Sequence, residues 1–100
     1  MNDFTVATEK HPDRTLITVS GDIDRQTCPE LAQAAAVPLD GRTLHLEMSG
    51  VSFMDSSGLH LLLLLRRRLH EDGGRLVVTG LQRQPTRLLH LTETYELLNA

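Results

Sequence analysis

The pattern that most constrains the fold is a strand, a helix and a second strand that follow one another in the middle of the chain. Residues 43–48 alternate apolar and polar side chains, which predicts a strand with one buried face. Residues 57–71 carry leucines at helical spacing, and two glycines at 73 and 74 end that helix. Residues 75–80 form an aliphatic strand of the kind buried on both faces of a parallel sheet. Two strands joined through a helix run parallel, so this segment predicts an α/β fold.

The upstream half repeats this order after an N-terminal hairpin. Residues 4–7 and 15–19 predict two strands that most simply pair as an antiparallel hairpin. Residues Thr27–Glu30 form the pattern of a helix capping box, with Thr27 as the N-cap. An alanine-rich helix is expected to continue over Leu31–Val37, where Pro38 stops it and Asp40 and Gly41 turn the chain.

The C-terminal segment adds at least one more helix. Pro85 is expected to open a short helix whose apolar residues are Leu88, Leu89 and Leu91. Residues 92–98 fit either a helical turn or a strand. The order predicts an α/β fold with a central mixed, mostly parallel four-stranded sheet, an antiparallel N-terminal edge strand and three or four helices. One hundred residues suffice for one domain spanning 1–100.

The long central helix carries more leucine than one helix face can bury. Its core-facing residues are predicted to be Leu59, Leu62, Leu63 and Leu69. The apolar arc is widened by Leu61, Leu64 and Leu65. At least one of these leucines should be exposed or covered by a partner, and a dimer contact is one use for such a surface.

Two acidic segments follow predicted strands at the same end of the sheet. Gly21 to Asp24 follows the second strand, and Met54 to Gly58 follows the third. Partners of such sheets meet the loops at the carboxyl ends of the strands, so we expect one acidic surface that contains both Ser56 and Ser57. Serine and aspartate at a helix start are capping residues. One serine, Ser57, can hold the helix start while Ser56 stays free for phosphorylation.

The spacing of reactive residues favours a binding domain over an enzyme. A nucleophilic serine would need a G-x-S-x-G elbow, which is absent, and His60 lies one turn away on the same helix. Asp22, Asp24 and Asp55 lack calcium-loop spacing, so a solvated acidic rim is favoured over a metal site or an acid–base pair. The histidines show no zinc-ligand spacing. No cofactor is expected.

Charge and composition restrict the partners and the compartment. The net charge of −3 at pH 7 disfavours nucleic acid as a direct partner. The longest apolar run is far shorter than the roughly 20 residues of a membrane span, and the first residues show no secretory signal. The single Cys28 excludes an internal disulfide and indicates a reducing, cytoplasmic location. As a residue at a predicted helix start, Cys28 could have a lowered pKa, but a structural thiol is favoured.

The segment from Phe53 to Leu59, together with Gly21 to Asp24 upstream, resembles a STAS domain of the bacterial anti-sigma factor antagonist (anti-anti-sigma factor) family. The resemblance covers most of the chain. It implies binding to an anti-sigma factor that is also a serine kinase, with release of a sigma factor. In this family the kinase phosphorylates the first serine after the aspartate, which corresponds to Ser56, and a phosphatase reverses the modification.

The resemblance also implies a set of contact residues. Asp24 would lie in the kinase-contacting loop, and Ser57 would be a cap or a support. The predicted partner-binding residues are Asp22, Ile23, Asp24, Met54, Asp55, Ser56, Ser57 and Gly58. No enzymatic activity of the chain itself is implied. The alternative is a STAS module without phosphorylation at Ser56 that docks in another assembly, such as an accessory subunit of a lipid-transport ATPase.

Overall fold

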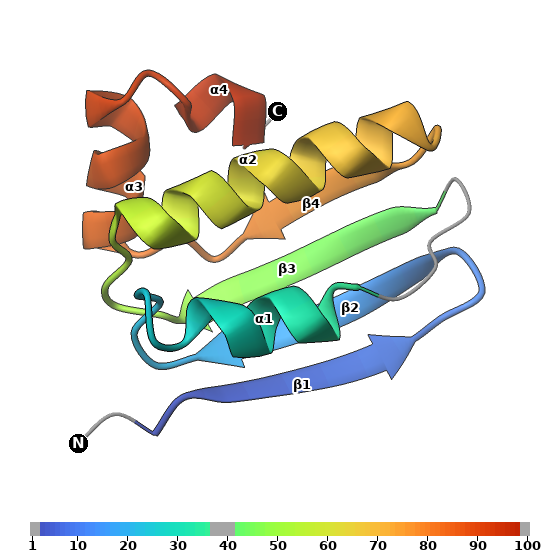
Figure 1. Cartoon of the computed structure of the whole chain (residues 1–100), viewed down its shortest axis with the longest axis horizontal. Helices are drawn as coiled ribbons and strands as arrows, with labels where there is room; N and C mark the ends of the chain where they lie inside the picture. Colours follow the sequence, from blue (N-terminus) through green and yellow to red (C-terminus); the bar gives the residue numbers. More distant parts are fainter. Residues whose placement is uncertain (1–2, 37–41, 99–100) are drawn as a thin grey trace.

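Four strands form one sheet in the order β1-β2-β3-β4 (Figure 1). The computed structural model describes residues 3–36 and 42–98 of the chain. Strand β1 pairs antiparallel with β2, whereas β2 with β3 and β3 with β4 pair in parallel. This confirms the predicted mixed sheet with an antiparallel N-terminal edge strand. The strands are β1 (Thr5–Lys10), β2 (Arg14–Ser20), β3 (Thr43–Gly50) and β4 (Arg75–Thr79).

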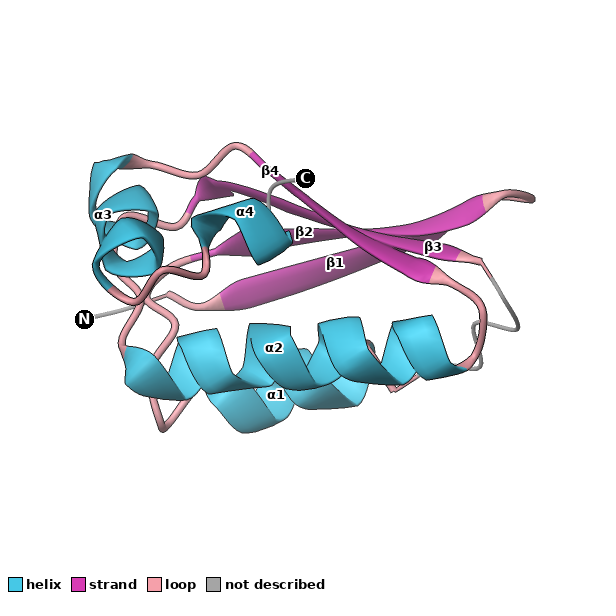
Figure 2. Cartoon of the chain, turned by 90° about the horizontal axis from the view of Figure 1, so that it is seen from above, coloured by secondary structure: helices cyan, strands magenta, loops and turns pink. Residues whose placement is uncertain are grey.

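Two helices, α1 and α2, cover one face of this sheet, and the other two lie beyond its β4 edge. Figure 2 shows α1 and α2 side by side along the same face of the sheet. The ambiguous segment at 92–98 ends in a helical turn, α4, and this turn packs against α2, α3 and β4. Helix α1 was expected to continue to Val37 but ends at Ala34, with Ala35 as its C-cap. The expected stop at Pro38 and the turn at Asp40 and Gly41 lie outside the described residues. The helices are α1 (Cys28–Ala34), α2 (Ser56–Glu71), α3 (Arg83–Leu91) and α4 (Tyr95–Leu98).

The core lies between the sheet and the two helices α1 and α2. Alternate side chains of a strand point to the same face, so Ile17 and Val19 of β2 are both buried, as the pattern predicts. Strand β3 contributes its predicted apolar set, and each of these side chains is fully buried: Leu44, Leu46 and Met48. Burial of this aliphatic set is the main favourable term that holds the helices on the sheet.

Strand β4 differs from its prediction, because it is buried on one face only. It forms an edge of the sheet, and Val78 is its single buried residue. The helices cover one face, so the register places Val77 beside His45 on the uncovered face, where both are half-buried. An aliphatic run predicts burial on both faces only when helices cover both. Val77 therefore packs among polar strand neighbours.

Helix α2 confirms most of its predicted core face. Three of the four leucines expected in the core are buried, namely Leu59, Leu62 and Leu69. The prediction was wrong for two others, since Leu65 is buried and Leu63 is half-buried. Leu65 lies three residues after Leu62 and four before Leu69, which places it on the same helix face.

Helix α2 ends at the two glycines, as predicted. Gly73 adopts a left-handed conformation with φ of 80°. The N–H of Gly74 donates to the carbonyl of Leu69 at 2.7 Å, and that of Gly73 donates to His70 at 3.2 Å. This pair of bonds is the Schellman motif, which satisfies the last carbonyls of a helix. The chain then enters β4 at Arg75.

Some large apolar side chains remain exposed in the described residues. Leu64 is 41% exposed, which confirms that the leucine run exceeds what the core can bury. Leu91 was expected among the apolar residues of α3 but is 75% exposed, because it follows the buried Leu89 by two residues and so lies on the other side of the helix. Use of these leucines as a dimer contact stays a prediction. No helix in residues 3–36 and 42–98 has the length and hydrophobicity needed to span a bilayer.

Candidate functional site

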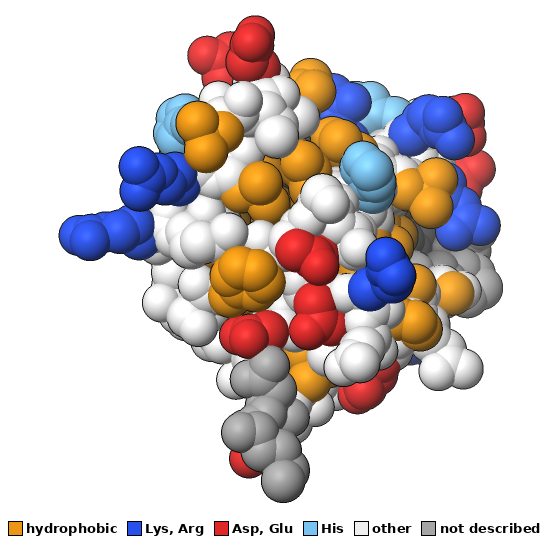
Figure 3. Space-filling model, turned by 60° about the vertical axis from the view of Figure 1, so that its left-hand side comes forward, with side chains coloured by type: hydrophobic (Ala, Val, Ile, Leu, Met, Phe, Trp, Pro, Cys, Tyr) orange, Lys and Arg blue, Asp and Glu red, His pale blue; other side chains and the backbone are white. Residues whose placement is uncertain are grey.

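The loop after β2 and the loop after β3 are joined by a short parallel bridge between Ile23 and Met54. The N–H of Ile23 donates to the carbonyl of Phe53, and the N–H of Asp55 donates to the carbonyl of Ile23, both at 3.0 Å. The two acidic segments therefore lie side by side at one end of the sheet. Figure 3 looks towards this end and shows acidic side chains beside one another, with hydrophobic side chains around them.

Asp55, and neither serine, caps helix α2. Its Oδ1 accepts hydrogen bonds from the N–H groups of Ser57 at 2.9 Å and Gly58 at 3.2 Å. The prediction that Ser57 holds the helix start was therefore wrong, since the carboxylate of Asp55, two residues earlier, accepts from the N–H groups of the first turn, including that of Ser57 itself. Ser56 is the first residue of α2 and is exposed, whereas Ser57 is half-buried. Among the described residues, no group hydrogen-bonds to the hydroxyl of Ser56.

Replacing Asp55 with alanine should lower stability by about 1 kcal/mol, the usual cost of losing an N-cap. Two N–H groups at the start of α2 would lose their acceptor. Asp55→Asn keeps an acceptor oxygen and serves as the matched control. Chemical denaturation of the three proteins measures the difference. If Asp55→Ala and wild type had the same free energy of unfolding, the cap would contribute nothing to stability.

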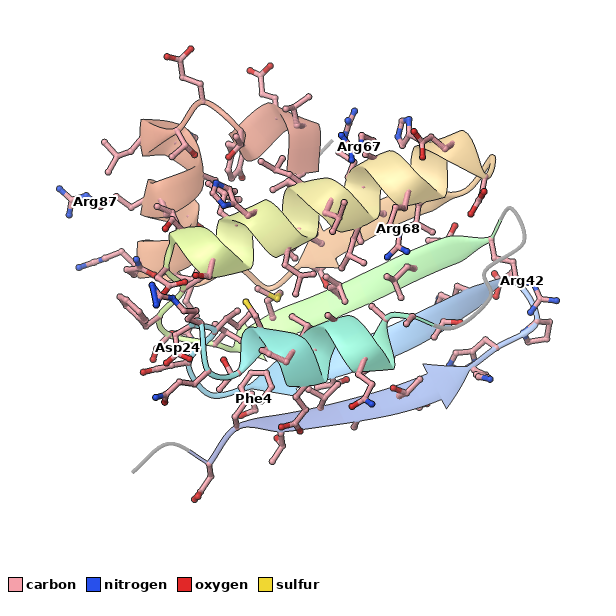
Figure 4. The ribbon with its side chains drawn as sticks, in the orientation of Figure 1. Phe4, Asp24, Arg42, Arg67, Arg68 and Arg87 are labelled. Atoms are coloured by element: carbon pink, nitrogen blue, oxygen red, sulfur yellow. The ribbon has the colours of Figure 1, made fainter. Side chains whose placement is uncertain are left out.

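The acidic loop after β2 is held by its own side chains. Asp24 Oδ1 accepts from the N–H groups of Gln26 at 2.9 Å and Thr27 at 3.1 Å. The hydroxyl of Thr27 donates to the carbonyl of Asp22 at 2.8 Å and accepts from the N–H of Asp24 at 2.9 Å. Figure 4 shows Asp24 at the end of the sheet where α1 begins. The loop is therefore a preformed turn.

These bonds correct the predicted capping box at Thr27 and Glu30. Thr27 does occupy the N-cap position of α1, but its side chain makes no capping bond. Its hydroxyl is engaged by the acidic loop instead, as serine and threonine near turns often are. The sequence therefore predicted the correct N-cap residue of α1, but it predicted a capping hydrogen bond that Thr27 does not make.

Three of the eight predicted partner-binding residues are internal supports of the site. Ile23 and Met54 are fully buried, and Gly58 in the first turn of α2 is buried as well. A Cβ on Gly58 would lie 2.5 Å from Cγ of Met54 and 2.7 Å from Cγ2 of Ile23, so the helix approaches the bridge as closely as glycine allows. The predicted residues with exposed or half-buried side chains are Asp22, Asp24, Asp55, Ser56 and Ser57.

Two residues of the site were not among the predicted contact residues. Phe53 precedes the bridge and is 42% exposed, so an aromatic ring is available at the rim of the acidic surface. Gln84 of α3 hydrogen-bonds to the backbone of Met54, thirty residues away in sequence. No local pattern predicts such a pair, because nothing in the spacing around position 84 refers to position 54.

Cys28 lies against the same acidic groups. Burial raises the pKa of its thiol, and the carboxylates of Asp55 and Asp24 raise this pKa further. The alternative of a helix start that lowers the pKa is therefore wrong, since these effects disfavour the thiolate. The described part of the chain contains no group of three or more histidine, cysteine, aspartate or glutamate side chains placed to hold a metal ion.

Comparison with known proteins finds relatives that match nearly the whole chain. The family model described as "Mlab, STAS domain" matches residues 6–99. An anti-sigma-B factor antagonist from Listeria monocytogenes is 30% identical over 98% of this chain and 88% of its own length. The crystal structure of an anti-sigma factor antagonist from Mycobacterium paratuberculosis has a TM-score of 0.82 at 32% identity, covering 96% of this chain and 83% of that one.

A third match concerns the fold alone. SpoIIAA of Bacillus has been solved unphosphorylated and phosphorylated, with TM-scores of 0.72 and 0.74 at 22% and 20% identity. Each match covers 96% of this chain. The matched part is 88% of the unphosphorylated SpoIIAA chain and 91% of the phosphorylated one. The chain belongs to the STAS family of anti-sigma factor antagonists. This confirms the resemblance seen in the sequence.

Proposed function

We propose that this protein is an anti-sigma factor antagonist whose binding to an anti-sigma factor with serine kinase activity is switched off by phosphorylation of Ser56. The names of its relatives support the first part of the proposal. The observation that carries the second part is the position of Ser56. It is exposed, it begins α2, and it follows the bridge that joins the two acidic loops.

In the proposed reaction the chain is a substrate and a binding partner. The hydroxyl oxygen of Ser56 forms a bond to the γ-phosphorus of ATP supplied by the kinase, while the bond to the β–γ bridging oxygen breaks and ADP leaves. A base of the kinase takes the hydroxyl proton. A phosphatase reverses the change by hydrolysis, which returns the serine hydroxyl and releases inorganic phosphate. We propose that both steps take place in the cytoplasm.

The geometry gives a physical reason why a phosphate would weaken binding. A phosphoserine adds about −1.5 to −2 charges, next to a surface that already holds Asp22, Asp24 and Asp55. The N–H groups of Ser57 and Gly58, which could otherwise neutralise a phosphate, are already bonded to Asp55. The phosphate would therefore face outward. A partner packed closely over Ser56 would meet unpaired charge.

Incubation with ATP and the candidate anti-sigma kinases of the same genome tests this proposal. Mass spectrometry of the peptide Asp55–Leu59 should then find one phosphate, on Ser56. The Ser56→Ala variant, treated in parallel, should remain unmodified. A phosphate on Ser57 alone would overturn the site assignment.

The alternative of a docking subunit without phosphorylation is not favoured, because the relatives that match the whole chain are named as anti-sigma factor antagonists. The same experiment separates the two. If no anti-sigma kinase modifies or binds the chain, the antagonist function fails and the docking role takes its place.

A further inference from the structure

We propose that Gln84 on α3 is a positioning residue that holds the loop in the conformation that presents Ser56. The proposal deepens the function proposed above and rests on it for the role of Ser56. Helix α3 follows β4 in sequence, and Figure 1 shows its first turn at the end of the sheet where α2 begins. The loop before α2 thus lies against residues contributed from the far end of the chain.

The carboxamide of Gln84 binds both backbone groups of Met54. Its Oε1 accepts from the N–H of Met54 at 2.8 Å, and its Nε2 donates to the carbonyl of Met54 at 3.0 Å. A carboxamide used in this way replaces the N–H and C=O of a neighbouring strand. Gln84 therefore acts on Met54 as one residue of an additional strand would.

The loop is bonded on its other side to the acidic segment after β2. The carbonyl of Phe53 and the N–H of Asp55 both bond to the backbone of Ile23. The backbone groups of Met54, which lies between them, bond to Gln84 instead. Adjacent residues thus bond to opposite sides, as in the middle strand of a sheet. The segment 53–55 has partners from β2 through the acidic loop and from α3, and it cannot rotate without breaking one set of bonds.

This double attachment bears directly on Ser56. Asp55 must keep its position to cap α2, and Ser56 follows it as the first helical residue. Removal of the Gln84 bonds would leave Met54 backbone groups without partners on that side and free the loop to move. Because a displacement of about 1 Å of a reacting group can lower a rate up to about 100-fold, such movement should affect transfer to Ser56.

Three variants separate positioning from general stability. Gln84→Leu has a similar volume and removes both bonds, while Gln84→Glu keeps the acceptor for the N–H of Met54 and removes the donor. Gln82→Leu is the matched control: Gln82 is the N-cap residue of the same helix, and its Nε2 donates to the carbonyl of Ser49 at 2.6 Å. Each variant is compared with the wild-type chain.

The first readout is amide hydrogen exchange of the free protein. The N–H of Asp55 bonds to Ile23 and not to Gln84, so it reports movement of the whole loop. In Gln84→Leu it should exchange at least about tenfold faster, while Leu46 in the middle of β3 should change less than about threefold. Gln82→Leu should leave the exchange of Asp55 unchanged.

The second readout is phosphorylation of Ser56 by the cognate anti-sigma kinase. Gln84→Leu should lower kcat about tenfold and change KM less than about threefold, since the loop before Ser56 is misplaced while the part of the docking surface formed by Asp22 and Asp24 remains. Gln84→Glu should lie between Gln84→Leu and wild type. Gln82→Leu should match wild type in both constants.

The outcomes are distinct. Unchanged exchange at Asp55 and unchanged kcat in Gln84→Leu would refute the positioning role. Equal acceleration at Asp55 and Leu46 would also refute it, because Gln84 would then act only on global stability. If no kinase modifies even the wild type, the proposed function fails, and the exchange of Asp55 alone decides whether Gln84 holds the loop.

Discussion

Ser56→Asp should bind the anti-sigma factor at least about tenfold more weakly than wild type, a difference of 1.4 kcal/mol. The substitution adds one negative charge beside the two bridged loops that carry Asp22, Asp24 and Asp55. Like charges at an interface cost up to several kcal/mol when water is excluded, so a single added carboxylate should reproduce part of the effect of a phosphate. Isothermal titration against the purified anti-sigma factor measures the change in Kd.

Ser56→Asn is the control for this experiment. Asparagine has nearly the same size and shape as aspartate but no charge, so it should bind within about threefold of wild type if charge is the cause. The difference in Kd between Ser56→Asp and Ser56→Asn should become smaller as salt is added, because exposed charges are screened beyond about 10 Å at 0.1 M ionic strength. Equal Kd values for the Asp and Asn variants would mean that shape and not charge controls binding.

Leu62→Ala should destabilise the protein by about 2–5 kcal/mol, the usual cost of deleting a fully buried leucine side chain. Leu62 has no exposed surface and lies at the centre of the buried face of α2. Each kcal/mol corresponds to about 4–8 °C in Tm for a domain of this size. The Tm of Leu62→Ala should therefore lie at least about 8 °C below that of wild type. Circular dichroism measures the shift.

Leu64→Ala provides the matched comparison on the same helix. The same atoms are removed, but Leu64 is 41% exposed. The expected loss is within about 0.5 kcal/mol, as for most surface substitutions. If the two variants unfolded at the same temperature, the assignment of the buried face of α2 would be wrong.

Periodicity predicted the parts of the fold that depend on local sequence. Alternation identified β2 and β3, leucine spacing identified α2, and the paired glycines identified its end. The shared position of the two acidic loops also followed, because parallel strands end on the same side of a sheet. These features need no knowledge of distant contacts.

The errors concern interactions that sequence spacing does not encode. The apolar run of β4 indicated burial on both faces, but its placement depends on which faces the helices cover. Asp55, Ser56 and Ser57 are all capping residues by type, and only the geometry shows that the carboxylate of Asp55 takes the donors. Gln84 was missed because its partner is distant in the chain.

The most direct test of the central proposal is the affinity of one preparation in three states. The wild-type protein is titrated against its anti-sigma factor before phosphorylation, after complete phosphorylation of Ser56, and after treatment with a phosphatase. We expect Kd to rise at least about 100-fold in the second state, and to return to its first value in the third. An unchanged Kd in the phosphorylated state would contradict the switch.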